Sequence, residues 1–152
     1  MPLTIISVGK KHEDWVATGI ERYQKRLKAP FSVTWELIAP SGHEGPSARQ
    51  DESERMLFRL TAYDFIVLLD ERGKSLDSPH LSSLLVERLH HSQKIALVIG
   101  GAYGVDDTIR QKADLVWSLS PLVFPHQLVR LILTEQLYRA QEIAAGHPYH
   151  HS

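Results

Sequence analysis

The sequence contains no cysteine among its 152 residues. This absence excludes a disulfide framework, a thiolate metal site and a cysteine nucleophile. Long apolar runs are also missing, since none approaches the ~20 residues that a transmembrane helix requires, and we expect no membrane partner. The N-terminal Met1-Pro2-Leu3-Thr4 lacks a basic segment followed by a long apolar stretch. We therefore expect no signal peptide and a cytoplasmic location.

An excess of charge of either sign is lacking too, because 17 basic and 18 acidic residues give a formal net charge of -1. A protein that holds bare nucleic acid by electrostatics alone is usually basic. The composition therefore disfavours a free RNA clamp, but not a protein that meets RNA inside a large assembly. Length and an ordinary apolar content of 43% predict one domain, residues 1–152.

Strand-like and helix-like segments alternate along the whole chain. The predicted strands are 3–8, 31–38, 65–69, 94–99 and 115–118, and the predicted helices are 14–27, 47–60, 78–90, 105–113 and 126–145. Continuous apolar runs at 65–69 and 94–99 are typical of parallel strands covered on both faces. Repeated strand–helix units predict an α/β fold, with a mostly parallel sheet covered by helices on both faces.

Several helix ends carry recognisable signals. Ser78 is predicted as an N-cap, with Pro79 at the first helical position, and Gly146 is predicted to end the last helix. That last helix is apolar on most of its faces, which indicates burial by its own sheet and by a second subunit. Arg139 follows Glu135 by four residues, a helical pair worth a few tenths of a kcal/mol. A role of Arg139 in binding substrate is the alternative.

Two loops at predicted strand ends are the most specific feature of the chain. Gly100 and Gly101 let a ligand approach the backbone closely, although a tight strand-to-helix turn would use the same residues. Pro121 and Pro125 stiffen the loop 119–126, which exposes backbone N–H and C=O groups. Ligands of open α/β sheets bind outside the carboxyl ends of the strands, so the loops predict a cofactor cradle. An ordinary proline-bearing surface loop is the alternative.

The polar tail His147-Pro148-Tyr149-His150-His151-Ser152 is placed to reach these loops. A frayed terminus is one alternative. A metal site is another, but adjacent histidines without a carboxylate make a poor closed site, and we predict no metal. His126 is either a base or simply the residue that starts the last helix.

Basic residues concentrate in one local strip, formed by Lys10, Lys11, Arg22, Lys25, Arg26 and Lys28. A solvated helix face is the simpler interpretation, and a surface that contacts phosphates is the alternative.

Taken in order, these motifs resemble the RlmH (YbeA-type) rRNA methyltransferases, which are minimal members of the SPOUT class. The resemblance rests on Ser7-Val8-Gly9-Lys10, Gly100-Gly101-Ala102-Tyr103-Gly104, the stretch 118–126, Glu135-Gln136-Leu137-Tyr138-Arg139-Ala140 and His147-Pro148-Tyr149-His150. It covers essentially the whole chain. Ala102-Tyr103 departs from the Pro-Glu of some relatives, which leaves side-chain contacts at that turn open.

The resemblance implies an α/β fold with a C-terminal trefoil knot, and a homodimer. It implies that S-adenosylmethionine lies against Leu69, Gly100, Leu119, Ser120, Pro121, Leu122, Val123 and Phe124. The implied reaction is methylation at N3 of pseudouridine 1915 (ribosomal numbering), in helix 69 of the 23S rRNA of the assembled ribosome.

Such a reaction requires the imide N3 to lose its proton, which calls for a base or for a cation that stabilises the anion. By resemblance the catalytic candidates are Arg139, Tyr149 and His150, with His126 as a further one. Arg139 would hold negative charge, a histidine would accept the proton, and the tail would complete the site across the dimer.

Two other classes of function were weighed. The first is a non-catalytic module of the same fold that binds the ribosome or RNA. The second is a flavodoxin-type oxidoreductase or regulator, which predicts a GxGxxG motif or a phosphate loop, and the sequence contains neither.

Overall fold

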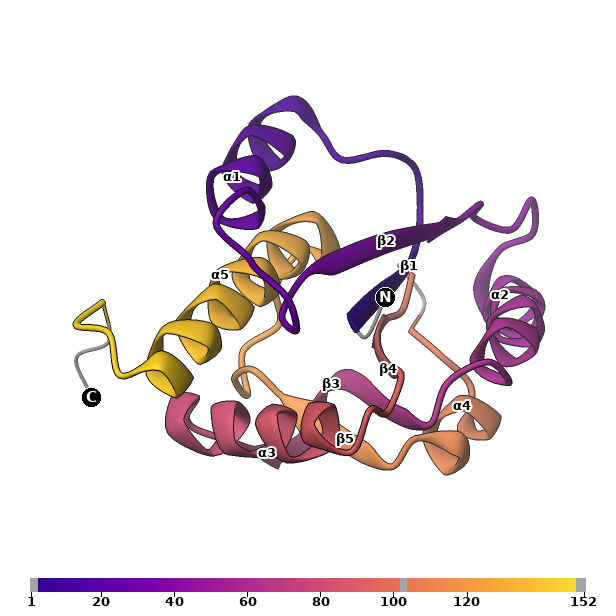
Figure 1. Ribbon diagram of the computed structural model, residues 1–152. Helices are drawn as coiled ribbons and strands as arrows, with labels where there is room; N and C mark the ends of the chain where they lie inside the picture. Colours follow the sequence, from indigo (N-terminus) through magenta and orange to yellow (C-terminus); the bar gives the residue numbers. More distant parts are fainter. Residues whose placement is uncertain (1–2, 102–103, 150–152) are drawn as a thin grey trace.

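The computed structural model describes residues 3–101 and 104–149, which form five strands and five helices (Figure 1). In chain order the elements are β1 (Leu3–Val8), α1 (Asp14–Gln24), β2 (Val33–Ile38), α2 (Gly45–Leu60), β3 (Phe65–Ser75), α3 (Ser78–His90), β4 (Ile95–Ile99), α4 (Asp107–Lys112), β5 (Leu115–Ser118) and α5 (His126–Ala145). The predicted alternation of strands and helices is confirmed, and most boundaries agree to the residue, whereas the others differ by one to six residues.

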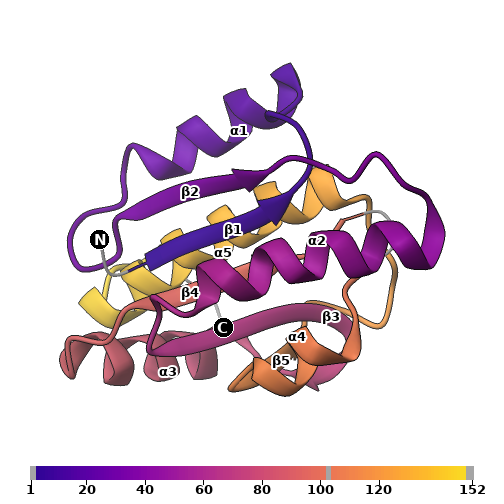
Figure 2. The same ribbon diagram turned by 90° about the vertical axis from the view of Figure 1, so that its right-hand side faces the viewer.

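The five strands form one sheet in the order β2-β1-β4-β3-β5, and every neighbouring pair is parallel (Figure 2). β1 and β4 lie inside the sheet, and all of their residues are buried. This explains why both strands read as nearly continuous apolar runs. The predicted parallel sheet is therefore confirmed.

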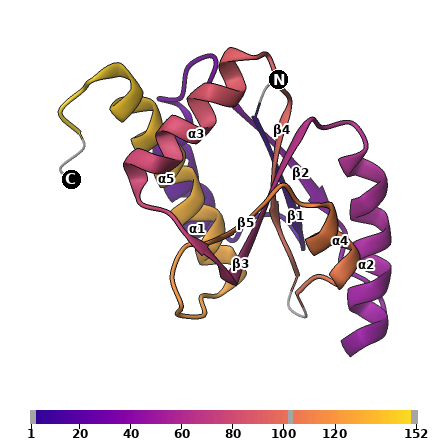
Figure 3. The same cartoon turned by 90° about the horizontal axis from the view of Figure 1, so that it is seen from below.

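Helices cover both faces of the sheet, with α1, α3 and α5 on one side and α2 and α4 on the other (Figure 3). Ile5 and Leu97 face the first side, where they join a cluster with Leu133 of α5. Their neighbours alternate to the second side, where a separate cluster includes residues of α2 and α4. The α/β fold with both faces covered is confirmed, and the trefoil knot stays a prediction.

The helix α3 spans 78–90 as predicted, but the predicted N-cap, Ser78, is wrong by one residue. Asp77 is the N-cap: its backbone is extended, and its side chain accepts a hydrogen bond from the backbone N–H of His80 at 2.9 Å. Ser78 is the first helical residue, and Pro79 follows it. Aspartate and serine are both good N-caps, so residue type alone does not distinguish them.

β3 is longer than predicted, because the chain bulges after Leu69 and then rejoins the sheet. Trp117 of β5 pairs first with Leu69 and again with Lys74, so the residues between them project from the sheet. A Cβ at Gly73 would lie 2.5 Å from the backbone oxygen of Val116, and only glycine fits there. The bulge carries Asp70 and Arg72 to the edge where β4 and β5 also end.

Candidate functional site

A cavity of about 590 Å³ opens at the carboxyl ends of β3, β4 and β5. Its walls include seven of the eight residues predicted to hold a cofactor: Leu69, Gly100, Leu119, Ser120, Leu122, Val123 and Phe124. Pro121 belongs to the same loop but does not line the cavity. The cofactor site predicted at the strand ends therefore coincides with a cavity, and the volume of this cavity is common for small-molecule sites.

The loop from Leu119 to Phe124 is braced by its own serines. Ser118 Oγ donates to the backbone oxygen of Ser120 at 2.9 Å, and Ser120 Oγ accepts from the backbone N–H of Leu122 at 3.0 Å. Leu122 and Val123 remain 68% and 78% exposed at the mouth of the cavity. A loop ordered in advance loses little conformational entropy when it binds a ligand.

Gly100 forms a turn that is also a wall of the cavity. A Cβ on Gly100 would lie 3.0 Å from Val105 Cγ1 and 3.2 Å from the carbonyl carbon of Gly104. The turn is closed by the N–H of Gly104, which donates to Gly101 at 2.9 Å. The turn and the cradle, which the sequence left as alternatives, are therefore the same structure. Ala102 and Tyr103 lie outside the described residues.

One rim of the cavity carries Asp70, a residue at a predicted strand end to which sequence reasoning assigned no role. Asp70 lies 3.1 Å from Arg72 and 2.9 Å from Arg110. Burial raises the pKa of the Asp70 carboxyl, but hydrogen bonds from Arg72 and Arg110 outweigh it and bring the pKa down to about 2. Asp70 is thus ionised throughout the physiological range and holds two cations at the cavity.

We expect Asp70→Asn to lower the free energy of unfolding at pH 7 by about 1–2 kcal/mol, because its paired carboxylate is lost. The lowered pKa places this stabilisation above pH ~4, and it disappears as the pH falls through about 2. Urea unfolding should therefore separate variant and wild type at pH 7 but not near pH 2. Asp107→Asn, on an 84% exposed side chain, is the control. Equal stability at pH 7 would contradict the role of Asp70.

His126 begins α5, as predicted, and lines the cavity. Burial, together with the positive charge of Arg130, lowers the pKa of His126. A neutral imidazole at pH 7 is able to accept a proton, which is consistent with the predicted role as a base.

Arg130, one turn further along α5, is fully buried. Its Nε donates to Ser7 Oγ at 3.1 Å and its Nη1 donates to the backbone oxygen of Lys10 at 2.9 Å. Sequence reasoning gave this residue no role. An arginine inside an otherwise apolar stretch of helix was the available signal.

At the other end of α5, Arg139 and Tyr149 share one carboxylate oxygen. Arg139 Nη2 lies 2.9 Å from Glu135 Oε2, and the Tyr149 hydroxyl donates to the same oxygen at 2.9 Å. The guanidinium carbon lies 4.9 Å from the centre of the Tyr149 ring. Burial and the hydrogen bond to Glu135 raise the pKa of Tyr149 to about 12. Tyr149 is thus packed on α5 through this tail cluster, which consists of Glu135, Arg139 and Tyr149.

Within one chain the structure does not bring the tail cluster to the cavity. His126 lies at the first turn of α5 and Arg139 near its last turns, so about 20 Å of helix axis separates them. His150, the remaining catalytic candidate, lies outside the described residues. The predicted catalytic residues therefore fall into two groups, His126 at the cavity and the tail cluster.

Within residues 3–101 and 104–149, no three histidine, aspartate or glutamate side chains are arranged to bind a metal ion. In the same ranges, no helix combines the length and the apolar character needed to cross a bilayer.

Comparison with known proteins places the chain among methyltransferases. A family model described as a predicted SPOUT methyltransferase matches residues 1–150. The ribosomal RNA large subunit methyltransferase H of Thioalkalivibrio sulfidiphilus is 41% identical over 155 residues, which cover 99% of each chain. The protein of the same name from Geotalea daltonii is 42% identical over 153 residues, covering 99% of this chain and 100% of the relative.

Two solved structures share the fold. A probable methylase family protein from Haemophilus influenzae aligns with a TM-score of 0.60 at 10% identity, over 99% of this chain and 71% of the other. The TrmH/SpoU tRNA modifying enzyme of A. aeolicus aligns with a TM-score of 0.52 at 15% identity, over 99% and 82%. At such low identities these similarities concern the fold alone.

Proposed function

This chain belongs to the SPOUT methyltransferase family, and from that premise we propose that it methylates large-subunit ribosomal RNA with S-adenosylmethionine as the donor. The observation that carries the proposal is the cavity at the strand ends, lined by the Gly100 turn and the braced loop of residues 119–124. Relatives about 40% identical over the whole chain are named for this activity. The finer proposal is methylation at N3 of pseudouridine 1915 (ribosomal numbering) in helix 69 of the 23S rRNA, on cytoplasmic ribosomes.

The residues present fit S-adenosylmethionine. Apolar walls from Leu69, Leu119 and Phe124 suit the adenine ring, and the braced loop offers backbone groups to the edge of that ring. Gly100 allows the tight turn that forms one wall of the cavity, where a Cβ would lie 3.0 Å from Val105 Cγ1. When bound, S-adenosylmethionine supplies an electrophilic methyl group on a good leaving group, so the protein has mainly to align donor and acceptor.

The residues of this chain would handle charge and proton at the acceptor base. N3 of a pyrimidine imide carries a proton, and the ring becomes negative when that proton leaves. We propose that Arg139 stabilises this charge with its guanidinium, in the way that fixed donors stabilise an oxyanion. Tyr149 holds Arg139 through Glu135 and stays a neutral phenol. His126 and His150 are the two candidates for accepting the proton.

A homodimer would complete the site, because one chain keeps the tail cluster and the cavity apart. We propose that the cluster of one subunit lies over the cavity of its partner. The exposed apolar side chains of Leu122 and Val123 at the cavity mouth support such a contact, since partner or ligand would cover them.

A radiolabelled methyl-transfer assay tests the proposed function. Ribosomes that lack the methyl mark, free large subunits and naked rRNA are compared, and the modified nucleotide is then mapped. We expect transfer to the intact ribosome at a single pseudouridine. No transfer, together with no binding of S-adenosylmethionine by calorimetry, would instead indicate a non-catalytic ribosome-binding module.

A further inference from the structure

We propose that a second cavity, between the C-terminal ends of α1 and α5, binds the sugar–phosphate backbone of the substrate rRNA beside the nucleotide that is methylated. This basic cleft has a volume of about 620 Å³, with Lys25, Arg26 and Lys28 among its walls. It is separate from the cavity at the strand ends. The inference rests on the proposed function, because it assigns part of the surface that recognises the same substrate.

Charge distribution is the first argument. Between Arg22 and Thr34 the sequence holds four cationic residues and no carboxylate, in a chain whose net charge is -1. Arg22, Lys25, Arg26 and Lys28 are all exposed, and none forms an ion pair with a carboxylate of the described ranges. Unpaired cations concentrated on one face attract a polyanion.

The carboxylate that lines the basic cleft offsets only part of this charge. Glu142 Oε2 lies 2.5 Å from His147 Nδ1. Hydrogen bonding from Tyr138 is the main cause that lowers the pKa of Glu142, followed by His147 and then by the charge of Lys28. One carboxylate among three cations leaves the cleft positively charged toward phosphate groups.

The shape of the surface is the second argument. A helix face that is simply exposed to solvent does not have to be concave. Here, however, Pro30, Ala144 and Ala145 line a cavity among the cations. Small apolar side chains flanked by cations suit a nucleotide, whose sugar and base are apolar on their faces and whose phosphate is charged. The segment is also held rigidly on α5, because Gln141 accepts from the Lys28 N–H at 2.7 Å and donates to the Arg26 oxygen at 3.0 Å.

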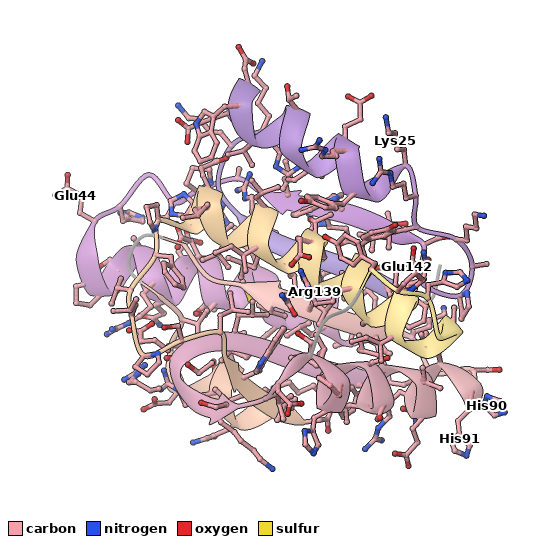
Figure 4. All side chains as sticks on the ribbon, turned by 90° about the vertical axis from the view of Figure 1, so that its left-hand side faces the viewer. Lys25, Glu44, His90, His91, Arg139 and Glu142 are labelled. Carbon is pink, nitrogen blue, oxygen red and sulfur yellow. The ribbon has the colours of Figure 1, made fainter. Side chains whose placement is uncertain are left out.

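Continuity with the tail cluster is the third argument. The guanidinium carbon of Arg26 lies 6.0 Å from the Tyr138 ring centre, and the Tyr138 ring lies 4.8 Å from that of Tyr149. Lys25, Glu142 and Arg139 lie on the same face of the molecule (Figure 4). An RNA strand that presents a base to Arg139 and Tyr149 therefore passes directly over the basic cleft.

The test removes the charge and keeps the shape. We compare wild type with the triple variant Lys25→Gln, Arg26→Gln, Lys28→Gln, and with Lys25→Gln, Lys28→Gln, which keeps the Arg26–Tyr138 contact. The control triple, Arg49→Gln, Lys94→Gln, Lys112→Gln, removes the same charge from exposed residues elsewhere. For each protein we measure KM for unmethylated ribosomes over a salt series, affinity for S-adenosylmethionine by calorimetry, and thermal melting.

We expect the cleft triple to raise KM for ribosomes about tenfold and to flatten the salt dependence by about two units of log–log slope, since each phosphate contact contributes about 0.7–0.9. The double variant should show an intermediate effect, and S-adenosylmethionine affinity should not change. KM values equal to those of the control triple would overturn the inference. So would ultraviolet cross-linking of residues 25–31 to a ribosomal protein and not to rRNA. An inactive wild type would refute the proposed function instead, so the two failures are distinguishable.

Discussion

Replacement of Arg139 by alanine is expected to lower kcat for methyl transfer by about 10²–10³, the usual cost of removing one fixed donor that stabilises developing negative charge. The fold should tolerate the change. In the described part of the chain, the contacts of Arg139 are with Glu135 and the Tyr149 ring, and a partly exposed ion pair of this kind is worth well under ~1 kcal/mol. Single-turnover methyl transfer and thermal melting, measured on the same preparation, check both parts of the expectation.

Two further variants separate this role from a general effect of charge. Arg139→Lys keeps the charge but loses the planar fork, so it should recover only part of the rate. Arg55 on α2 is the matched control, because it also pairs with a carboxylate one turn away, Asp51 at 2.8 Å. Arg55→Ala should transfer methyl groups at the wild-type rate. A wild-type rate for Arg139→Ala would remove Arg139 from the mechanism.

Mixed dimers test whether the site is shared between subunits. Gly100→Val should distort the turn that forms one wall of the cavity, since its added Cβ would lie 3.0 Å from Val105 Cγ1 and 3.2 Å from the carbonyl carbon of Gly104. In a dimer of Arg139→Ala with Gly100→Val, one site joins the intact cavity of the first chain to the intact tail cluster of the second. Random mixing should then restore about a quarter of wild-type activity. If cavity and cluster act within one chain, every site keeps a defect and mixing restores nothing.

The separation of Arg139 from the cavity within one chain shows where sequence reasoning about this chain stops. Periodicity predicted the strands and helices because local patterns of apolar residues dictate them, and β5 and α5 agree with the prediction residue for residue. It also placed the two cavity loops at strand ends. The distance between Arg139 and the cavity was not predictable, because it depends on how the whole of α5 lies across the sheet.

The features that the sequence did not predict depend on contacts between residues that are far apart in the chain. β3 was expected to end at Asp70, because a run of charged residues follows Leu69. In the structure the strand continues past a bulge, since Gly73 lies against the backbone of Val116, far along the chain. Asp70 then meets Arg110 of α4 at the cavity rim. Local patterns contain no information about such partners.

The hydrogen-bond partners of Arg130 also lie far away in the sequence, so local patterns could not predict them. Replacing Arg130 by methionine is expected to lower the free energy of unfolding by about 3 kcal/mol. An unchanged stability of the methionine variant would also have a physical explanation, because proteins in which apolar side chains replace a buried ion pair are often as stable as the original. Here, however, Arg130 has no carboxylate within ion-pair distance in the described part of the chain. Its partners include Ser7 Oγ, the Lys10 oxygen and His12 Nδ1, which remain in place and lose the guanidinium.

Histidine titration distinguishes lost charge from lost hydrogen bonds. Burial lowers the pKa of His12 and of His126, and the charge of Arg130 adds to the lowering in both. Arg130→Met should therefore raise both pKa values, as measured by NMR, whereas Arg130→Lys should keep them low but still lose stability. A methionine variant as stable as wild type, with unchanged histidine titration, would contradict this account. If both effects appear, the buried guanidinium braces the segment between β1 and α1 and also keeps the imidazole at the cavity neutral, which is the protonation state that a base requires.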